Sequence, residues 1–388
     1  MKIFRDPIYG YIPICKNYCE DFIDTSILQR LRRIEQTSMR ILYPSAHHDR
    51  FAHSIGVFHL GQIAFDNLKT NSEKYFKEEV SEDQWQYYKA TFEIACLLHD
   101  CGHSPFSHTF EHYYLLGNED KVEKEILNYF SDCETFIDEY REASPAPHEK
   151  ISALLLLRIF SDKISSKYSA SPQLAARMIM GCKHYDPSNV TTKIENKLIS
   201  LLNGSGIDVD SLDYIQRDSW ASGVCNVDID YQRLLSSLMI KPGNHGNPEI
   251  VFKKNVLSVI DNISIGRNFL YKWIYSHHIV SYEQYLMGHI VEKINSDSKN
   301  KLKNSMFSIN SFFETTKFNN FTYYLPSDDD LMHTIKCFID SDPMIKELIS
   351  RKYKYKAIWK TYFEFNETYF HDISLDNRMK ISAKLKKG

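Results

Sequence analysis

The chain has 388 residues, of which 43% are hydrophobic and 25% are charged. This balance is that of an ordinary globular protein and excludes disorder over most of the length. The size predicts one large domain or two smaller ones, and only 14 glycines and 12 prolines favour helix over a turn-rich β fold. The net charge of −3 gives no global basic character for duplex nucleic acid.

The sequence also bears on where the protein works. No apolar run approaches the roughly 20 residues of a membrane span, and the polar start MKIFRDPIYG does not resemble a secretory signal. Eight cysteines include no CxxC pair, which favours reduced thiols over disulfides. We therefore predict a cytoplasmic protein without membrane contact.

The first hundred residues are predicted to be mostly helical after a short extended start. Pro7 and Gly10 interrupt residues 1–12, which predicts an extended or turn segment there. A helix is expected from Asp24 or Thr25 and another from Asp49, because each can cap the apolar pattern that follows it. A polar loop is expected over 69–84, followed by an apolar helix over 88–98.

Further helices are expected along the rest of the core. A hinge is predicted at 204–210, and 226–253 is the stretch with strand-like pieces and Gly/Asn turns. The expected helices cover 149–160, 173–182, 195–203, a segment from about 210, and 255–294.

The C-terminal quarter has a different composition. Residues 295–322 are rich in Lys, Asn and Ser and predict a boundary or an exposed connection. Residues 328–365 are again helical in pattern, and 377–388 form a basic tail. We predict an all-α protein with a helical core over 1–294 and a smaller, mainly helical C-terminal lobe over 295–388.

His-Asp dipeptides occur at 48–49, 99–100 and 371–372, and context separates them. His99–Asp100 ends a buried apolar helix, and burying an imidazole beside a carboxylate is costly unless something pairs them. A divalent cation would do so, and His103 and His108 follow within a Gly- and Pro-containing segment. The alternative is a helix-ending pair that is hydrogen-bonded to backbone.

A run of four carboxylates follows the predicted hinge. Asp208, Asp210, Asp213 and Asp218 lie within eleven residues, among Ile207, Val209 and Leu212. Asp210 and Asp218 share one helix face with Tyr214. Such a run is usually a cap and a solvated face, but its apolar neighbours are unusual for a plain surface.

The segments around these residues resemble the HD-domain phosphohydrolases, whose signature is H…HD…D. The resemblance implies one metal ion held by His53, His99, Asp100 and Asp210. This mixed N/O donor set suits Mn, Fe, Mg or Zn. On an octahedral ion it leaves two positions, one for a water and one for a phosphate oxygen.

The likeness extends to the dNTP triphosphohydrolase branch over nearly the whole chain. It rests on DPIYGYI, IDTSILQRLRRIEQ, RFAHSIGV, LLHDCGHSPFSHTFE and GIDVDSLDYIQRD, in that order. The resemblance implies that Arg50, His103 and His148 contact phosphate. It makes His108 the general acid/base, with a pKa that the neighbouring Glu111 would raise.

The same resemblance implies two nucleotide pockets. Gln36 and Asp218 would read the sugar 3′-hydroxyl, Tyr214 and Tyr275 would stack on sugar and base, and Arg267 would bind the triphosphate. Lys2, Asp24, Gln29 and Arg32 would form an allosteric site for a guanine-nucleotide activator, although capping and surface charge explain that group equally well. The family also implies a homo-oligomer, a dimer or a tetramer.

Two positions depart from the family. Ser211 stands where the mammalian member of this family has a phosphate-binding Lys, so one positive charge is missing from the expected phosphate site. Thr37 stands where a Leu helps to exclude the ribose 2′-hydroxyl, and a hydroxyl there can accept that group instead. These departures put the preference for deoxynucleotides in question.

The expected activity is metal-dependent hydrolysis of a nucleoside triphosphate or deoxynucleoside triphosphate to nucleoside and inorganic triphosphate. Two alternatives use the same ligands. One is an HD phosphodiesterase or nuclease acting on nucleic-acid ends or a signalling nucleotide, which leaves nucleic acid open as a partner. The other is a nucleotide sensor without catalysis.

Overall fold

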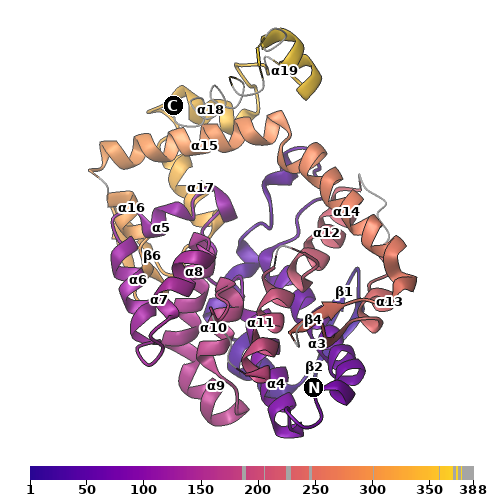
Figure 1. Cartoon of the computed structure of the whole chain (residues 1–388). Coiled ribbons are helices and arrows are strands. Elements are labelled where there is room, and N and C mark those ends of the chain that lie inside the picture. Colours follow the sequence, from indigo (N-terminus) through magenta and orange to yellow (C-terminus); the bar gives the residue numbers. More distant parts are fainter. Residues whose placement is uncertain are drawn as a thin grey trace.

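The computed structural model describes residues 1–185, 189–204, 206–223, 229–243, 247–299, 301–357 and 359–369, with 373, 374 and 377. Helices dominate this part of the chain, and its strands form small two-stranded antiparallel sheets (Figure 1). The predicted all-α class is therefore confirmed. The predicted basic tail lies almost wholly outside the described residues, and the His-Asp dipeptide at 371–372 lies entirely outside them.

The chain opens with a β-hairpin, where an extended or turn segment was predicted. β1 (Lys2–Asp6) pairs with β2 (Gly10–Ile14). Gly10 has φ +78°, a conformation that side chains with a Cβ disfavour. Short helical elements follow, and Thr25 caps α2 as predicted. They are α1 (Lys16–Tyr18), η1 (Cys19–Ile23), α2 (Ser26–Arg30), η2 (Leu31–Arg33) and η3 (Ser38–Ile41).

Two long helices form the centre of the core. Asp49 caps α3 (Arg50–Ser72) by accepting from the backbone N–H of Ala52 at 2.8 Å, as predicted. α4 (Glu82–Leu98) packs against α3. The predicted loop over 69–84 is shorter than expected, because α3 continues to Ser72, whose buried hydroxyl accepts from the N–H of Ile240. η4 (Glu73–Tyr75) lies in what remains of that loop.

The remaining core helices surround this pair. The helices predicted over 149–160, 173–182 and 195–203 are confirmed, and the first continues as a π-helical segment. These elements are η5 (Ser107–Thr109), α5 (His112–Leu115), α6 (Glu119–Asn128), α7 (Phe136–Ala143), α8 (Pro147–Leu155), η6 (Leu156–Phe160), α9 (Ser161–Tyr168), α10 (Pro172–Met180), α11 (Val190–Leu202) and α12 (Val209–Ser222).

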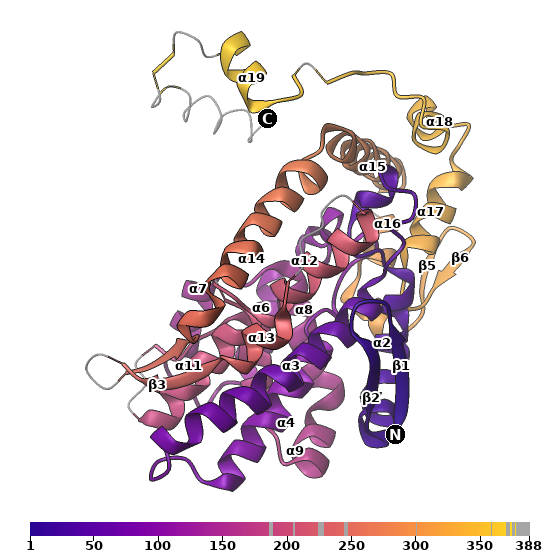
Figure 2. The same ribbon diagram turned by 90° about the vertical axis from the view of Figure 1, so that its right-hand side faces the viewer.

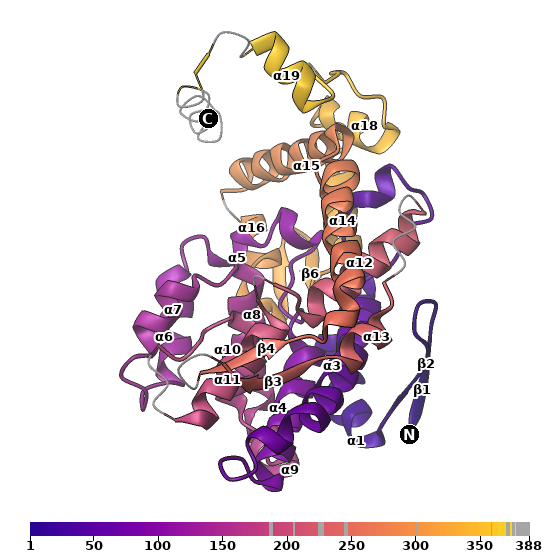
Figure 3. The ribbon, with the colours of Figure 1, turned by 45° about the vertical axis from the view of Figure 1, so that its right-hand side comes forward.

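The described part of 226–253 contains the predicted strands. They form a second hairpin, and the long helix that follows, α14, packs along α12 (Figure 3). The elements are α13 (Tyr231–Ser236), β3 (Met239–Pro242), β4 (Pro248–Val251), η8 (Lys254–Val256), α14 (Leu257–Leu270), η9 (Tyr271–Tyr275) and α15 (His278–Asp297).

The interpretation of 295–322 as an exposed connection was wrong. Leu302, Met306, Phe307 and Phe312 are buried, and the Phe307 ring centroid lies 5.2 Å from that of Tyr113. Asn304 and Asn310 are exposed, whereas Ser305 and Ser311 are buried with the apolar side chains, so the polar composition concealed an apolar face. The elements here are α16 (Lys301–Met306), η10 (Ile309–Phe312), β5 (Thr316–Phe318) and β6 (Phe321–Tyr323).

The predicted helical stretch over 328–365 is interrupted. α17 (Asp328–Cys337) and α18 (Pro343–Ser350) are followed by a non-helical segment before α19 (Tyr362–Tyr369). Figure 2 shows this segment leading away from the rest of the described chain. Among the described residues, none of the helices combines the length and apolarity needed to cross a lipid bilayer.

A buried ion pair inside the core supports a stability prediction. Glu139 on α7 accepts from Arg177 on α10 at 2.7 Å, and both side chains are buried. Glu139→Gln leaves the guanidinium without its counter-ion, and we expect a loss of about 3–5 kcal/mol in the free energy of unfolding. Chemical denaturation would measure it. Glu82→Gln, which loosens the exposed pair with Lys69, should leave the free energy of unfolding almost unchanged.

Candidate functional site

Three segments bring the predicted metal ligands together. His53 lies in the first turn of α3, His99 and Asp100 directly follow α4, and Asp210 is the second residue of α12. α3 packs against both α4 and α12, so the three segments meet at one point. His53, His99 and Asp100 are buried, whereas the Asp210 side chain is 39% exposed and leaves the cluster open to solvent.

The four side chains converge at ligand spacing. His53 Nε2 lies 3.3 Å from His99 Nε2 and 3.5 Å from Asp100 Oδ2. Asp210 Oδ1 lies 2.9 Å from His53 Nε2 and 3.7 Å from His99 Nε2. Neighbouring atoms bound to one ion at about 2.0–2.3 Å are about 2.8–3.8 Å apart, depending on whether the angle between them is octahedral or tetrahedral. The measured separations therefore fit donors around a single ion.

The hydrogen bonds of the two imidazoles fix their tautomers. His53 Nδ1 lies 2.7 Å from the carboxylate of Asp213, and His99 Nδ1 lies 2.9 Å from the carbonyl oxygen of Cys96. Both partners accept, so each Nδ1 carries a proton. Against the effect of burial, hydrogen bonds to Asp210 and Asp213 raise the pKa of His53 to about 10, so without a bound cation its Nε2 also carries a proton, which it shares with Asp210 and His99. A divalent cation would take the place of that proton between the two Nε2 atoms and the carboxylates. The site can therefore hold a divalent metal ion, and its N/O donor set does not select one element.

A buried ionic network supports His53 from behind. Asp213 accepts from Arg217 through both oxygens, at 2.8 and 2.9 Å, and from the hydroxyl of Tyr9 at 2.8 Å. Arg217 in turn pairs with Asp6 at 2.9 Å. The Arg217 guanidinium and the bond from His53 hold the pKa of Asp213 well below its usual range despite burial. The carboxylate therefore stays charged and orients the imidazole.

Close approach of α3 and α12 depends on Gly56. A Cβ built at this position would lie 1.9 Å from Asp213 Oδ1 and 2.4 Å from Arg217 Nη2. Any side chain here would therefore displace the network behind His53.

A second cluster adjoins the metal site. Glu111 Oε2 lies 2.8 Å from His148 Nδ1, 3.3 Å from His108 Nδ1 and 3.8 Å from His103 Nδ1. The rings of His103 and His148 stack with centroids 4.1 Å apart. His103 Nε2 also lies 3.1 Å from Asp100 Oδ1, which joins the two clusters. The spacing of these four groups would itself admit a cation.

Glu111 raises the pKa of His108, as expected, but it does not decide the net shift. The pKa of His108 is lowered, because desolvation, Arg50 and His148 together outweigh the attraction of Glu111. Glu111 also raises the pKa of His148 against its burial. Burial and Arg50 lower the pKa of His103 well below its ordinary value. The cluster therefore holds one imidazole that favours its cation and two that favour their neutral forms.

Arg50 is held by protein groups. It is buried and donates to Asp100 Oδ2 at 2.7 Å, to Ser107 Oγ at 3.0 Å and to the carbonyl of Gln36 at 3.1 Å. Its Nη2 also lies 3.3 Å from His108 Nε2. This geometry makes Arg50 a support for Asp100 and His108, and its predicted phosphate contact stays a prediction.

A small cavity lies beside His108. Its volume is about 120 Å³, smaller than the roughly 300–1,000 Å³ of most ligand pockets, so a whole nucleotide would have to extend beyond it. Gln36, Thr37 and Tyr275 line it. The side-chain oxygens of Gln36 and Thr37 are buried without a hydrogen-bond partner. Such atoms are costly unless a ligand or water pairs with them.

Asp218 is already paired. It is fully buried, with one oxygen 2.6 Å from His48 Nε2 and the other accepting from the hydroxyl of Tyr275. A sugar hydroxyl would have to compete with the Tyr275 hydroxyl for this carboxylate. Tyr214 on α12 is half-buried, and its neighbour Arg267 on α14 is exposed. Burial raises the pKa of Tyr214, and the positive charge of Arg267 partly offsets that rise.

The structure separates the four predicted allosteric residues into two pairs. Lys2 and Asp24 form an exposed ion pair at 2.7 Å. Gln29 and Arg32 hydrogen-bond to each other at 2.9 Å and line a cavity of about 690 Å³ that contains further arginines. Surface pairing explains the first two residues, and their predicted role stays a prediction.

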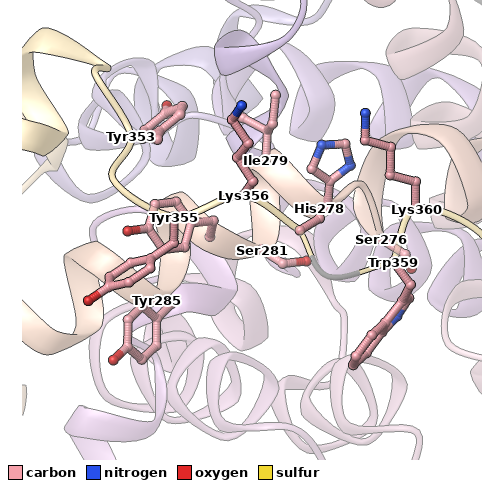
Figure 4. Close-up of a pocket in the computed structure, with 12 residues that line it drawn as sticks. Ser276, His278, Ile279, Ser281, Tyr285, Tyr353, Tyr355, Lys356, Trp359 and Lys360 are labelled. Atoms are coloured by element: carbon pink, nitrogen blue, oxygen red, sulfur yellow. The ribbon is translucent and has the colours of Figure 1, made fainter. Parts of the chain in front are cut away.

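A further groove lies away from the metal ligands. Its volume is about 740 Å³, and the start of α15 and the segment after α18 form its walls. Figure 4 shows the rings of Tyr285, Tyr355 and Trp359 and the ammonium groups of Lys356 and Lys360 around it. Sequence analysis gave none of these residues a role.

Sequence analysis also missed the residues behind the ligands. Asp213 was one of the four carboxylates in the run, but its partner Arg217 was not considered. The spacing of four residues between them was the available signal, because it places an Asp and an Arg on the same helix face. Nothing in the local sequence indicated that Tyr9, Asp6 or His48 would join this region.

Ser211, which replaces a family lysine, has a structural role. It is buried, and it forms a capping box with Asp208 at the start of α12, with its N–H donating to that carboxylate at 2.7 Å. The side chain at position 211 therefore caps a helix and does not supply the positive charge that the family resemblance led us to expect there.

An all-α core that joins two imidazoles and two carboxylates from separate helices is typical of a class of metal-dependent hydrolases. The HD domain family matches residues 50–163, which include His53, His99 and Asp100. This segment is therefore an HD domain, and its clustered His and Asp side chains could hold a divalent metal ion.

Relatives by sequence support the triphosphohydrolase resemblance. An uncharacterized protein of Mycoplasma genitalium is 32% identical over 70% of this chain and 56% of its own length. Proteins named deoxynucleoside triphosphate triphosphohydrolase SAMHD1 include a homologue in Dictyostelium discoideum, 28% identical over 72% of this chain and 46% of its own length. The one from Gallus gallus is 25% identical over 93% of this chain and 56% of its own length. The chain spans about half the length of the curated relatives it matches.

A solved structure shares the fold. A hypothetical protein from Aquifex aeolicus superposes with a TM-score of 0.64, covering 95% of this chain and 80% of its own, at 23% identity. This likeness extends the shared fold beyond residues 50–163 to most of the chain.

Proposed function

We propose that this protein hydrolyses nucleoside triphosphates to nucleoside and inorganic triphosphate. The observation that carries the proposal is the convergence of four donors. The Nε2 atoms of His53 and His99 lie 3.3 Å apart, oxygens of Asp100 and Asp210 lie within 3.7 Å of them, and a histidine cluster adjoins them. A divalent ion bound there supplies an activated water and neutralises phosphate charge. His53, His99, Asp100 and Asp210 would hold it.

The histidine cluster would bind the phosphates. Glu111 raises the pKa of His148, so this imidazole favours the cationic form that pairs with a phosphate oxygen. His103 stacks on His148. Its Nε2 lies 3.1 Å from Asp100 Oδ1, and its Nδ1 is buried without a hydrogen-bond partner. As a neutral imidazole it can donate one hydrogen bond to a bound phosphate. Glu111 orients the cluster from behind.

His108 is the group that can deliver a proton to the leaving oxygen. Its side chain is exposed, unlike that of His103, and it lies within reach of Glu111 and Arg50. Its lowered pKa leaves it largely neutral before substrate binds. The polyphosphate brings negative charge, which favours the imidazolium, so His108 would take up its proton as the substrate enters.

Relatives named triphosphohydrolases favour nucleoside triphosphates over other phosphoesters as the substrate. The test is a panel of each NTP and dNTP with the metal-loaded protein, with and without GTP or dGTP, analysed by chromatography. Nucleoside and triphosphate are the expected products. Single-stranded DNA and RNA belong in the same panel, because cleavage of these alone would assign a phosphodiesterase instead. A panel without any product would reject hydrolysis.

Thr37 is predicted to influence the choice of sugar. Its hydroxyl and the side-chain oxygen Oε1 of Gln36 are buried without partners beside His108, and the vicinal hydroxyls of a ribose can pair with both. Thr37→Val keeps the shape and removes the hydroxyl. We expect the ratio of kcat/KM for an NTP over its dNTP to fall about three- to tenfold. An unchanged ratio would contradict the assignment, and Thr109→Val provides a control on the same cavity wall.

A further inference from the structure

A carboxylate of the C-terminal lobe reaches into the region of the proposed catalytic histidines. Asp328, the first residue of α17, accepts from the backbone N–H of Phe106 at 2.6 Å through Oδ1. Its Oδ2 accepts from the backbone N–H of Glu35 at 2.8 Å. The side chain is buried, so both oxygens are used within the protein.

The first of these donors belongs to a strained turn. Phe106 and Ser107 have φ of +57° and +52°, and they directly precede His108. The left-handed region is unfavourable for residues with a Cβ, because the Cβ crowds the following carbonyl oxygen. Two successive residues in this conformation need support from their surroundings. The bond from Phe106 to Asp328 provides it at the first of the two.

The second donor belongs to Glu35, a residue that links the same turn to the metal site. Ser107 Oγ donates to the carbonyl of Glu35 at 2.5 Å and accepts from Arg50 Nε at 3.0 Å. Arg50 donates to the metal-site carboxylate Asp100. Asp328 therefore binds the backbone at Phe106 and at Glu35, the two segments that the Ser107 hydroxyl also joins. The turn, Arg50 and Asp100 form one continuous hydrogen-bond network.

Asp328 is not needed to begin its own helix. Ser327 is the N-cap of α17, and Asp330 completes the capping box by accepting from the Ser327 N–H at 2.8 Å. Burial also raises the pKa of Asp328 to about 7, so a carboxylate is costly at this position. The contacts that offset this cost are the two backbone N–H groups beside the site.

We propose that Asp328 is a positioning residue that holds the left-handed turn before His108 and thereby places that imidazole over the metal site. The inference rests on the proposed function only for the role of His108. It assigns to the C-terminal lobe a direct part in shaping the site.

Asp328→Asn is the test variant. The amide has nearly the same shape, but its NH₂ group would face one of the two N–H donors, so one bond is lost. Asp329→Asn is the matched control, because Asp329 is the next residue of α17 and forms an exposed pair with Arg33 across the same boundary. Both variants would be compared with the wild type for bound metal, Tm, kcat and KM on the best nucleotide of the panel, and amide exchange of peptides covering 104–109.

For Asp328→Asn we expect kcat to fall about 10- to 100-fold, because small displacements of a catalytic group have effects of this size. KM should change by less than about threefold, bound metal should be unchanged, and exchange in 104–109 should quicken. Asp329→Asn should match the wild type in all of these. A kcat equal to that of the control, or unchanged exchange, would overturn the proposal, as would a loss of kcat that follows loss of metal.

Two further outcomes can be distinguished from a failure of this proposal. If the wild type hydrolyses no nucleotide, the proposed function fails, and the exchange of 104–109 still decides whether Asp328 holds the turn. If Asp328→Asn does not fold, the wild type alone decides. The Phe106 N–H should then exchange far more slowly than a free loop amide, and rapid exchange would exclude the bond.

Discussion

Asp210→Ala is expected to remove the metal ion and to lower hydrolysis by on the order of 10³-fold or more. Asp210 supplies the oxygen that lies 2.9 Å from His53 Nε2 and 3.7 Å from His99 Nε2, and it is the member of the set that is open to solvent. Without it, only the donors of His53, His99 and Asp100 remain to bind the ion. Elemental analysis of the purified variant would measure the bound metal, and product chromatography would measure turnover.

The fold should survive this substitution, because the Asp210 side chain is 39% exposed and its helix is capped by Asp208. Asp66→Ala is the control, since Asp66 forms an exposed pair with Lys89 on the adjoining helices. That variant should keep both metal and activity. Full metal content in Asp210→Ala would remove Asp210 from the ligand set.

Asp213→Asn is expected to weaken metal binding about 10- to 100-fold, although Asp213 is not a ligand. Its carboxylate holds the Nδ1 proton of His53 and thereby keeps the Nε2 lone pair directed at the ion. Loss of the charge also leaves Arg217 with Asp6 as its remaining partner, so the free energy of unfolding should fall by up to about 3–5 kcal/mol. Metal titration and chemical denaturation would measure the two effects.

Glu139→Gln separates these two effects. It breaks a buried ion pair of the same kind, but its partner Arg177 lies on α10 and not behind a metal ligand. We expect comparable destabilisation with unchanged metal affinity. If both variants lost affinity in proportion to stability, Asp213 would have no specific influence on the ion.

The proposed metal ligands came from the resemblance of their segments to a known family. Periodicity alone placed His99 and Asp100 at the end of a buried helix and His53 near the start of another, but it did not make His53 a ligand. The carboxylate run left a choice among four aspartates. Helical spacing grouped Asp210 with Asp218, whereas the structure sends the first to the metal site and pairs the second with His48 and Tyr275.

The partner of Glu111 could not be predicted in the same way. His108 is three residues from Glu111 and was the obvious candidate, but His148 is 37 residues away and lies closer, at 2.8 Å against 3.3 Å. The balance of burial and charge then lowers the pKa of His108 rather than raising it. Such a balance depends on which distant groups share the site, and spacing along the chain does not contain that information.

The sequence by itself determined the all-α class and the order of the principal helices, because capping and periodicity are local properties. The four proposed metal ligands followed from the resemblance of the segments that carry them to a known family, and their role stays a prediction. Tertiary structure alone decided what surrounds those residues. It brought Asp6, Tyr9 and Arg217 behind His53, buried the polar stretch over 295–322, and carried Asp328 to the turn before His108. Each of these depends on packing between segments far apart in the chain, where the energy of a contact is set by burial and geometry and not by neighbouring residues.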